Sequence, residues 1–222
     1  MKLSDSFVRK FLRTHYEMDV TVRLLPGELD HNFHIRSADN RDFIFKIANK
    51  KEERKNLELQ HAVINHLAVK KEGLEISRIV PAADGREIVE IDTDGDPPRL
   101  ARLLTWVDGT VLAEVNPHTP ELLEGLGAMC GKLCRSLSDF DHPDAHRFMK
   151  WDPSQLEWTK EHHALFTDEE KQIVNYFYSL FQTSAAPLLG LLRKSVNYND
   201  ANDYNVLVSG PADKRIVPGV ID

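Results

Sequence analysis

The sequence predicts an α+β protein in which a β-rich first half is followed by a helical second half. Through about residue 107, apolar runs of strand length surround one amphipathic helix, in the order β-β-β-α-β-β. Beyond that point the apolar residues recur at helical spacing, and strand-like runs return only near the end. Because successive parallel strands need crossover connections, this order predicts an antiparallel sheet with one helix packed against it.

The composition is that of an ordinary globular protein. The 222 residues are 41% hydrophobic and 28% charged, and the formal net charge is −7. This length allows one large domain or two small lobes with a sizeable core. The acidic balance argues against general binding to nucleic acid or to an anionic membrane.

The sequence also indicates the compartment. No stretch reaches the roughly 18 to 20 apolar residues that cross a bilayer, and the first six residues lack the apolar core of a secretory signal. Cys130 and Cys134 lie four residues apart in a helical pattern and are expected to be reduced thiols. We therefore expect a cytoplasmic protein.

The first half begins with a predicted helix. Ser4 or Ser6 is expected to cap it, with Phe7, Phe11 and Leu12 on one face. The runs that follow are rich in β-branched and aromatic residues and are typical of strands. The expected strands cover residues 20–25, 33–37, 42–47, 86–91 and 100–106.

Two further local signals organise this half. Asp39-Asn40, between the second and third strands, predicts a tight hairpin turn. An amphipathic helix is expected from about residue 51 to residue 70, with Leu57, Ile64 and Leu67 on one face.

Helices dominate the second half. Thr119 followed by Pro120 starts a helix that is expected to run through Leu137. Residues 167–170 form a capping box that opens another helix, through about Gln182. A short apolar run at 187–192 and strands at 206–208 and 216–221 complete the chain. The change of pattern predicts an amino-terminal lobe over residues 1–107 and a helical lobe over residues 108–222.

One group of residues near the carboxyl end indicates a chemistry. Asp200 is followed five residues later by Asn205, and a predicted hairpin then ends at Asp222. This is the layout of a kinase catalytic loop and its metal site. Phosphoryl transfer needs a carboxylate beside the attacking hydroxyl and oxygen ligands that hold Mg²⁺ against the nucleotide phosphates. Alone, the Asp-Asn spacing is weak evidence, because polar turns are rich in both residues.

A lysine in the first half strengthens this interpretation. Lys46 interrupts the apolar run Phe43-Ile44-Phe45-Lys46-Ile47 on the third predicted strand. The alternative is a lysine that solvates the edge of a sheet. The joint occurrence of this lysine, the two lobes and the Asp-Asn loop favours a phosphate-binding residue.

Several segments resemble a known family. They are Pro26–Phe33, Arg41–Asn49, Leu57–Gln60, Arg102–Trp106, Phe140–Pro143, Trp151–Asp152 and Asn199–Asn205. Through them the chain resembles the aminoglycoside phosphotransferase/choline kinase superfamily of small-molecule kinases, over essentially its whole length. Within it, the sequence is most similar to the hydroxylysine kinase-like branch. The resemblance implies a two-lobed protein-kinase-like fold with an incomplete carboxyl-terminal lobe.

The resemblance also implies roles for individual residues. Asp200 would accept the proton of the substrate hydroxyl, and Asn205 and Asp222 would bind Mg²⁺. The co-substrate would be ATP or GTP, with Lys46 at its α- and β-phosphates. The rest of the implied nucleotide site consists of backbone N–H groups of Asn32 and Phe33 in a turn over residues 30–33, the side chain of Gln60, and hinge backbone groups of Thr105, Trp106 and Val107.

The sequence departs from the family pattern at three informative places. Tyr198 stands where the family usually has a histidine, two residues before the catalytic aspartate. Gln60 stands at the helix position expected to pair with Lys46, so that a hydrogen bond would replace an ion pair. The chain stops at Asp222, where superfamily members continue, and we therefore expect a truncated form. Branch members also occur fused to aminotransferase-like enzymes, so a fused or associated domain of that kind is a further expectation.

These expectations leave two hypotheses. The first is a kinase that phosphorylates a hydroxyl of a small amino-bearing metabolite, with 5-hydroxylysine-like amino alcohols as the first candidates and homoserine, choline or aminoglycosides as others. The second is a nucleotide-binding or interaction module with little transferase activity. A eukaryotic-type protein kinase is disfavoured, because no activation-loop segment follows Asp222 in this sequence.

Overall fold

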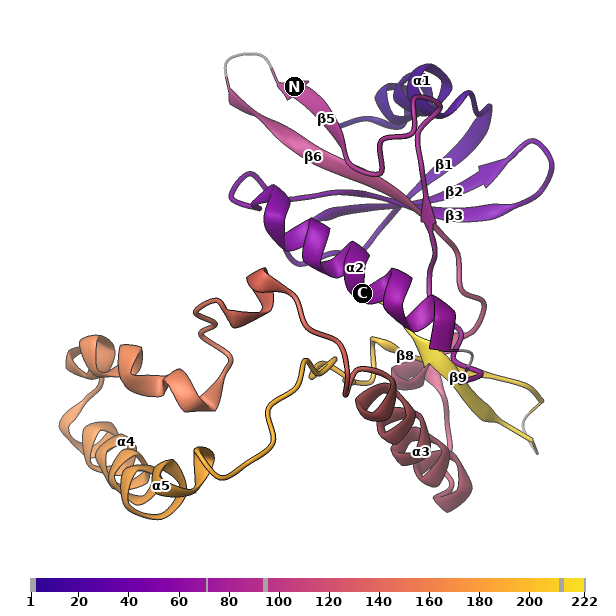
Figure 1. Ribbon diagram of the computed structural model, residues 1–222. Helices are drawn as coiled ribbons and strands as arrows, with labels where there is room; N and C mark the ends of the chain where they lie inside the picture. Colours follow the sequence, from indigo (N-terminus) through magenta and orange to yellow (C-terminus); the bar gives the residue numbers. More distant parts are fainter. Residues whose placement is uncertain (1–2, 71, 94–95, 212–213, 222) are drawn as a thin grey trace. The chain divides into compact units, whose positions relative to one another are not determined.

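The computed structural model describes residues 3–70, 72–93, 96–211 and 214–221. The chain forms two compact units (Figure 1), one made of Met1–His142 with Val196–Asp222 and the other of Pro143–Ser195. The expected lobe boundary near residue 108 lies inside the first unit, and the division into residues 1–107 and 108–222 stays a prediction.

Helix α1 (Asp5–Tyr16) opens the first unit. Of the two candidate caps, the structure uses Ser4, whose side chain accepts a hydrogen bond from the backbone N–H of Phe7 at 3.3 Å. Phe11 and Leu12 are buried on its inner face, as expected. α1 therefore covers one face of the sheet that follows.

The sheet is antiparallel, as the sequence predicted. Its strands are β1 (Val20–Leu25), β2 (His31–Ser37), β3 (Asp42–Ile47), β4 (Ile79–Val80), β5 (Val89–Thr93) and β6 (Asp96–Thr105). The strand order is β1-β2-β3-β6-β4, and β5 also pairs with β6. Strand β4 was not anticipated, because two residues are too few to show a period. Strand β2 begins two residues earlier than expected, and β6 begins four residues earlier.

The two faces of this sheet differ in chemistry. On β3, Phe43, Phe45 and Ile47 are buried and belong to the core shared with α1. The residues between them, Ile44 and Lys46, point to the opposite face, because side chains alternate along a strand. The lysine that interrupts the apolar run is thus on the face that α1 does not cover.

Helix α2 (Arg54–Lys70) packs on that opposite face, as Figure 1 shows. Leu57 is buried in a small cluster with Ala48, Ile88 and Leu100. Two expected members of its apolar face, Ile64 and Leu67, are only half-buried. Leu67 instead packs against a second core, described next. The helix therefore serves two cores, which explains why no single apolar stripe runs along it.

The second core lies in the helical part of the first unit. Thr119 caps helix α3 (Pro120–Ser136) by accepting a hydrogen bond from the Leu122 N–H at 3.3 Å, as the Thr-Pro pair predicted. A small antiparallel sheet packs against α3, in the order β7-β8-β9. Its strands are β7 (Thr110–Val111), β8 (Val206–Ser209) and β9 (Ile216–Val220), and a 3-10 turn, η1 (Leu112–Glu114), follows β7.

One glycine fixes the position of β9. The Glu75 N–H donates to the Pro218 carbonyl at 2.9 Å, and Glu75 forms a parallel bridge with Gly219. A Cβ at Gly219 would lie 1.7 Å from the Glu75 carbonyl oxygen, which no packing adjustment accommodates. The chain therefore needs glycine at 219 so that the backbone of the segment before β4 can lie directly beside β9.

The second unit consists of helices and 3-10 turns. They are η2 (Pro143–His146), η3 (Pro153–Leu165), α4 (Asp168–Leu180), a π-helical turn η4 (Phe181–Ala185) and α5 (Ala186–Leu189). The predicted capping box is present: Thr167 and Glu170 exchange hydrogen bonds at the start of α4. No side chain of residues 143–195 is buried. Across the described part of the chain, no helix is long and apolar enough to cross a membrane.

Candidate active site

The loop before β8 holds the predicted catalytic aspartate in a network of side-chain amides. The two carboxylate oxygens of Asp200 accept separate hydrogen bonds, from Asn202 Nδ2 at 2.8 Å and from Asn205 Nδ2 at 2.9 Å. Asn202 Oδ1 in turn accepts the backbone N–H of Tyr204. The Asp200 side chain remains exposed. Its carboxylate is therefore oriented by two donors and still reaches solvent.

The same loop is tied to the end of the β8–β9 hairpin. The Ile221 N–H donates to the Asn205 carbonyl at 2.9 Å, which extends the β8–β9 ladder beyond the Val206–Val220 pair. Asp222, the second predicted metal ligand, lies outside the described residues. The hairpin nevertheless brings its neighbour Ile221 directly beside Asn205, as the spacing of the motif implied.

Asn205 has the donor atoms that a hard cation needs. Its Nδ2 group is engaged by Asp200, which leaves the Oδ1 carbonyl oxygen as a ligand atom. Carboxylate and amide oxygens are the ligands that Mg²⁺ prefers. The described half of the predicted metal site therefore fits a magnesium ion.

Tyr198 connects the loop to the hairpin a second time. Its hydroxyl donates to the Ile221 carbonyl at 2.7 Å, and its ring packs against the second core. Burial, followed by the nearby Asp200 carboxylate, raises the pKa of Tyr198. The side chain is therefore a neutral phenol that donates this hydrogen bond. Tyr198, which departs from the family pattern, thus links the loop to the hairpin and to the second core.

Lys46 is almost completely enclosed on β3, with 5% of its surface exposed. Burial is the main cause that lowers the pKa of its ammonium, to about 8, and the charge of Arg102 acts in the same direction. Asp30 opposes this shift. At neutral pH the ammonium is still mostly protonated, as an interaction with phosphate requires.

Arg102 is a buried cation beside Lys46 that the sequence reasoning did not single out. It lies directly opposite Lys46 in the β3–β6 register and is equally buried. Its guanidinium donates through Nη2 to Gln60 Oε1 on α2, at 2.5 Å. The signal was present in the sequence, because Arg102 interrupts the apolar run of β6 as Lys46 interrupts that of β3. The described partner of Gln60 is therefore an arginine, and the predicted contact of Gln60 with the nucleotide remains untested.

The expected phosphate-covering turn over residues 30–33 lies differently in the structure. Residues 26–30 form the connection, and His31 to Phe33 are already part of β2. Asn32 is the cross-strand partner of Lys46 on β2. Phe33 is 1% exposed and lies in the core with α1. Any contact of Phe33 with a nucleotide is thus limited to its backbone.

The predicted hinge is partly engaged by the protein itself. The N–H of Thr105 donates to the Arg78 carbonyl at 2.8 Å, and the N–H of Trp106 donates to the Asp42 carbonyl at 3.2 Å. The Trp106 ring also stacks edge-on against His34. The backbone groups of the predicted hinge that remain for a nucleotide base are therefore its carbonyl oxygens and the backbone of Val107. The Val107 residue is itself buried.

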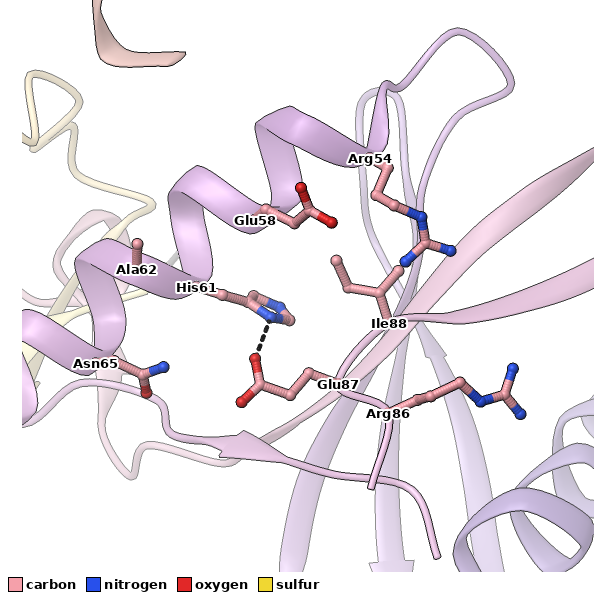
Figure 2. Close-up of a pocket in the computed structure, with 8 residues that line it drawn as sticks. All are labelled: Arg54, Glu58, His61, Ala62, Asn65, Arg86, Glu87 and Ile88. Carbon is pink, nitrogen blue, oxygen red and sulfur yellow. Dashed lines mark hydrogen bonds and ion pairs between the residues drawn. The ribbon is translucent and has the colours of Figure 1, made fainter. Parts of the chain in front are cut away.

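A cavity of about 480 Å³ lies between α2 and the segment that leads into β5 (Figure 2). His61 reaches from α2 to Glu87, with Nδ1 3.1 Å from Oε2. Burial, followed by the charge of Arg102, lowers the pKa of His61. None of the predicted site residues lines this cavity, whose lining residues are Arg54, Glu58, His61, Ala62, Asn65, Arg86, Glu87 and Ile88. Its walls carry both signs of charge, and the His61–Glu87 contact joins α2 to the segment that leads into β5.

Comparison with known proteins agrees with this geometry. A sequence model described as "Phosphotransferase enzyme family" matches residues 21–222. The chain belongs to that family. Among curated relatives of this phosphotransferase-family chain are the hydroxylysine kinases of Danio rerio and Xenopus laevis, each 29% identical over 99% of the chain. The chain spans 64% of the first and 61% of the second.

Solved structures show the fold of the family member. The chain is similar to a microcompartment-associated aminopropanol kinase, with a TM-score of 0.72 and 18% identity over 98% of this chain and 69% of that one. It is also similar to an amicoumacin kinase solved with AMP-PNP, Ca²⁺ and Ami, with a TM-score of 0.70 and 16% identity over 98% of this chain and 62% of that one. The expected kinase-like α+β fold is therefore confirmed for the part that this chain covers.

Proposed function

We propose that the protein is a small-molecule kinase that transfers the γ-phosphoryl group of ATP or GTP to a hydroxyl of an amino-bearing metabolite. The observation that carries this proposal is the geometry of the loop before β8. The Asn205 side chain donates a hydrogen bond to the Asp200 carboxylate, and the Asn205 backbone carbonyl accepts one from the Ile221 N–H. This arrangement supports a carboxylate beside a metal ligand at the end of a hairpin. Phosphoryl transfer uses this pair of groups.

Each residue has one task in the proposed reaction. Asp200 accepts the proton of the substrate hydroxyl as the oxygen attacks the γ-phosphorus, and the nucleoside diphosphate leaves with the electron pair of the broken bond. Asn205 and Asp222 would hold Mg²⁺, whose charge would neutralise the nucleotide phosphates when it is bound. Lys46 adds a positive charge on the same phosphates. Tyr198 keeps the loop in register with the hairpin.

The acceptor is proposed at the level of a chemical class. Hydroxylysine and aminopropanol, the substrates that the names of relatives and structural neighbours give, both carry a hydroxyl and an amine. We therefore propose an amino alcohol, with 5-hydroxylysine as the first compound to test. Homoserine, choline and aminoglycosides form the comparison set. Association with an aminotransferase-like domain stays a prediction of the sequence resemblance.

The direct test measures nucleoside diphosphate release with Mg-ATP and Mg-GTP in the presence of each acceptor. We expect acceptor-dependent turnover that Asp200→Asn reduces by 100-fold or more, the usual scale for removing a general base. The control is Asp203→Asn, because Asp203 is an exposed carboxylate three residues away in the same loop. Turnover that is equal in wild type and Asp200→Asn would contradict the mechanism. Nucleotide binding without transfer to any acceptor would favour the second hypothesis, a binding module.

A further inference from the structure

Three polar residues form a row across the centre of the sheet. Asn32 on β2 faces Lys46 on β3, and Lys46 faces Arg102 on β6. Cross-strand partners point to the same side of a sheet. The row therefore lies on the face that α1 does not cover, with the Arg102 guanidinium beside the ammonium that is predicted to bind phosphate.

Burial disfavours the charge of both cations in this row. Lys46 and Arg102 are each 5% exposed, and the charge of each is disfavoured by burial. The pKa of Arg102 is lowered to about 10, so the guanidinium stays protonated at neutral pH. The acidic groups that oppose the shift are Asp30 and Glu52. A bound anion would favour the charged forms of both groups.

The hydrogen bonds of Arg102 give a second observation. Nη2 donates to Gln60 Oε1, which is a neutral acceptor. Nη1 is buried and has no hydrogen-bond partner within the described residues. An arginine with a neutral partner and an unsatisfied donor is unusual for a purely structural role, because an apolar side chain of similar size would fill the same space without the desolvation penalty.

We propose that Arg102 is a second cation of the nucleotide-phosphate site. Its charge, next to that of Lys46, attracts the phosphates, and Gln60 fixes the orientation of the guanidinium. The inference rests on the proposed function only to the extent that the protein binds a nucleoside triphosphate. It assigns to β6 a part in phosphate binding that the sequence motifs did not give it.

The test compares a ligand with base and phosphates, a ligand with phosphates alone and a ligand with the base alone. Binding of ATP, inorganic tripolyphosphate and adenosine is measured by calorimetry for wild type, Arg102→Met and Arg102→Lys. We expect Arg102→Met to weaken ATP and tripolyphosphate about tenfold or more and to change adenosine less than twofold, because only the phosphates feel the lost charge. Arg102→Lys keeps the charge and is expected to stay within about threefold of wild type. Arg9→Met is the matched control, since it removes an exposed arginine from α1, on the other face of the sheet.

Each remaining outcome decides the inference. Equal losses for ATP and adenosine in Arg102→Met, or no loss for either, would overturn it. If Arg102→Met does not fold, as judged by circular dichroism, Arg102→Gln against Arg102→Lys gives the same comparison of charge at similar length. A wild-type protein that binds ATP but transfers no phosphate contradicts the proposed kinase and leaves this inference to be decided by the variants. A wild-type protein that binds neither ATP nor tripolyphosphate contradicts both.

Discussion

Replacing Lys46 by methionine is expected to stabilise the fold while it removes nucleotide binding. Methionine has a similar length and fills the same enclosed space without a charge. The surroundings of Lys46 oppose its charged form, since they lower its pKa from 10.5 to about 8. A buried residue whose charge is costly to the fold is the pattern expected of a binding group.

The size of the effect follows from the shift. One pKa unit corresponds to about 1.4 kcal/mol, so the charged ammonium costs the folded state on the order of 3 kcal/mol. The attraction between Lys46 and Asp30 is already included in this shift, so the figure is a net cost. For a chain of this size, each kcal/mol moves Tm by about 2 to 4 °C. We therefore expect Lys46→Met to raise Tm by roughly 6 to 12 °C at pH 7.

The same shift fixes the pH dependence. Below about pH 8 both the folded and the unfolded states hold the Lys46 proton, and the full penalty applies. Between about 8 and 10.5 the unfolded state holds the proton while the folded state has released it, so wild-type stability rises with pH. The advantage of Lys46→Met is thus largest below pH 8 and fades toward pH 10.5.

Urea unfolding at pH 7 and at pH 10 checks this reasoning, with ATP binding measured on the same samples. Lys51→Met serves as the control, because Lys51 is exposed a few residues further along the chain. The reasoning is refuted if Lys46→Met is less stable than wild type at pH 7, or if its stability relative to wild type does not change with pH.

Three further predictions concern the framework around the site. Tyr198→Phe leaves the Ile221 carbonyl without its hydrogen-bond donor and is expected to lower the free energy of unfolding by about 1 to 2 kcal/mol in urea. It is also expected to lower kcat more than it raises the KM for ATP. A variant with unchanged stability and unchanged kcat would contradict the supporting role of Tyr198. In Gly219→Ala the added Cβ collides with the Glu75 carbonyl, and Tm is expected to fall by 10 °C or more in thermal scans. A Tm within about 2 °C of wild type would exclude the close backbone contact between Glu75 and Gly219. Leu12→Ala is expected to lower the free energy of unfolding by about 2 to 5 kcal/mol in urea, because the Leu12 side chain is fully buried. Under conditions in which the variant is folded, its affinity for ATP is expected to match that of wild type, since Leu12 packs on the sheet face opposite Lys46.

Local signals predicted many of the helix starts and strands in the two units. Ser4, Thr119 and the capping box at Thr167 mark helix starts that the structure confirms, because capping depends on a few neighbouring residues. The alternation on β3 correctly placed its apolar residues on one face. Strand β4 and the two-core packing of α2 could not be predicted, since both depend on contacts between segments far apart in the sequence.

The candidate site was predictable in part for the same reason. Asp200 and Asn205 contact each other across five residues, so their spacing alone indicates the contact that the structure shows. The pairing of Arg102 with Gln60 spans 42 positions and requires both the strand register and the placement of α2. Sequence spacing could not supply either. The resemblance gave Gln60 a lysine as its expected partner, and the described contact is with the arginine on the next strand.

The structure shows how a tyrosine is accommodated at position 198, two residues before the predicted catalytic residue Asp200. Three contacts converge on the last residues of the hairpin: the Tyr198 hydroxyl on the Ile221 carbonyl, the Ile221 N–H on the Asn205 carbonyl, and the Glu75 backbone on Gly219. The first two come from residues of the loop before β8, and the third comes from the segment before β4. The position of Ile221 is therefore fixed from two sides. A side chain at 198 needs only to donate one hydrogen bond and to fill the core below, and a phenol does both.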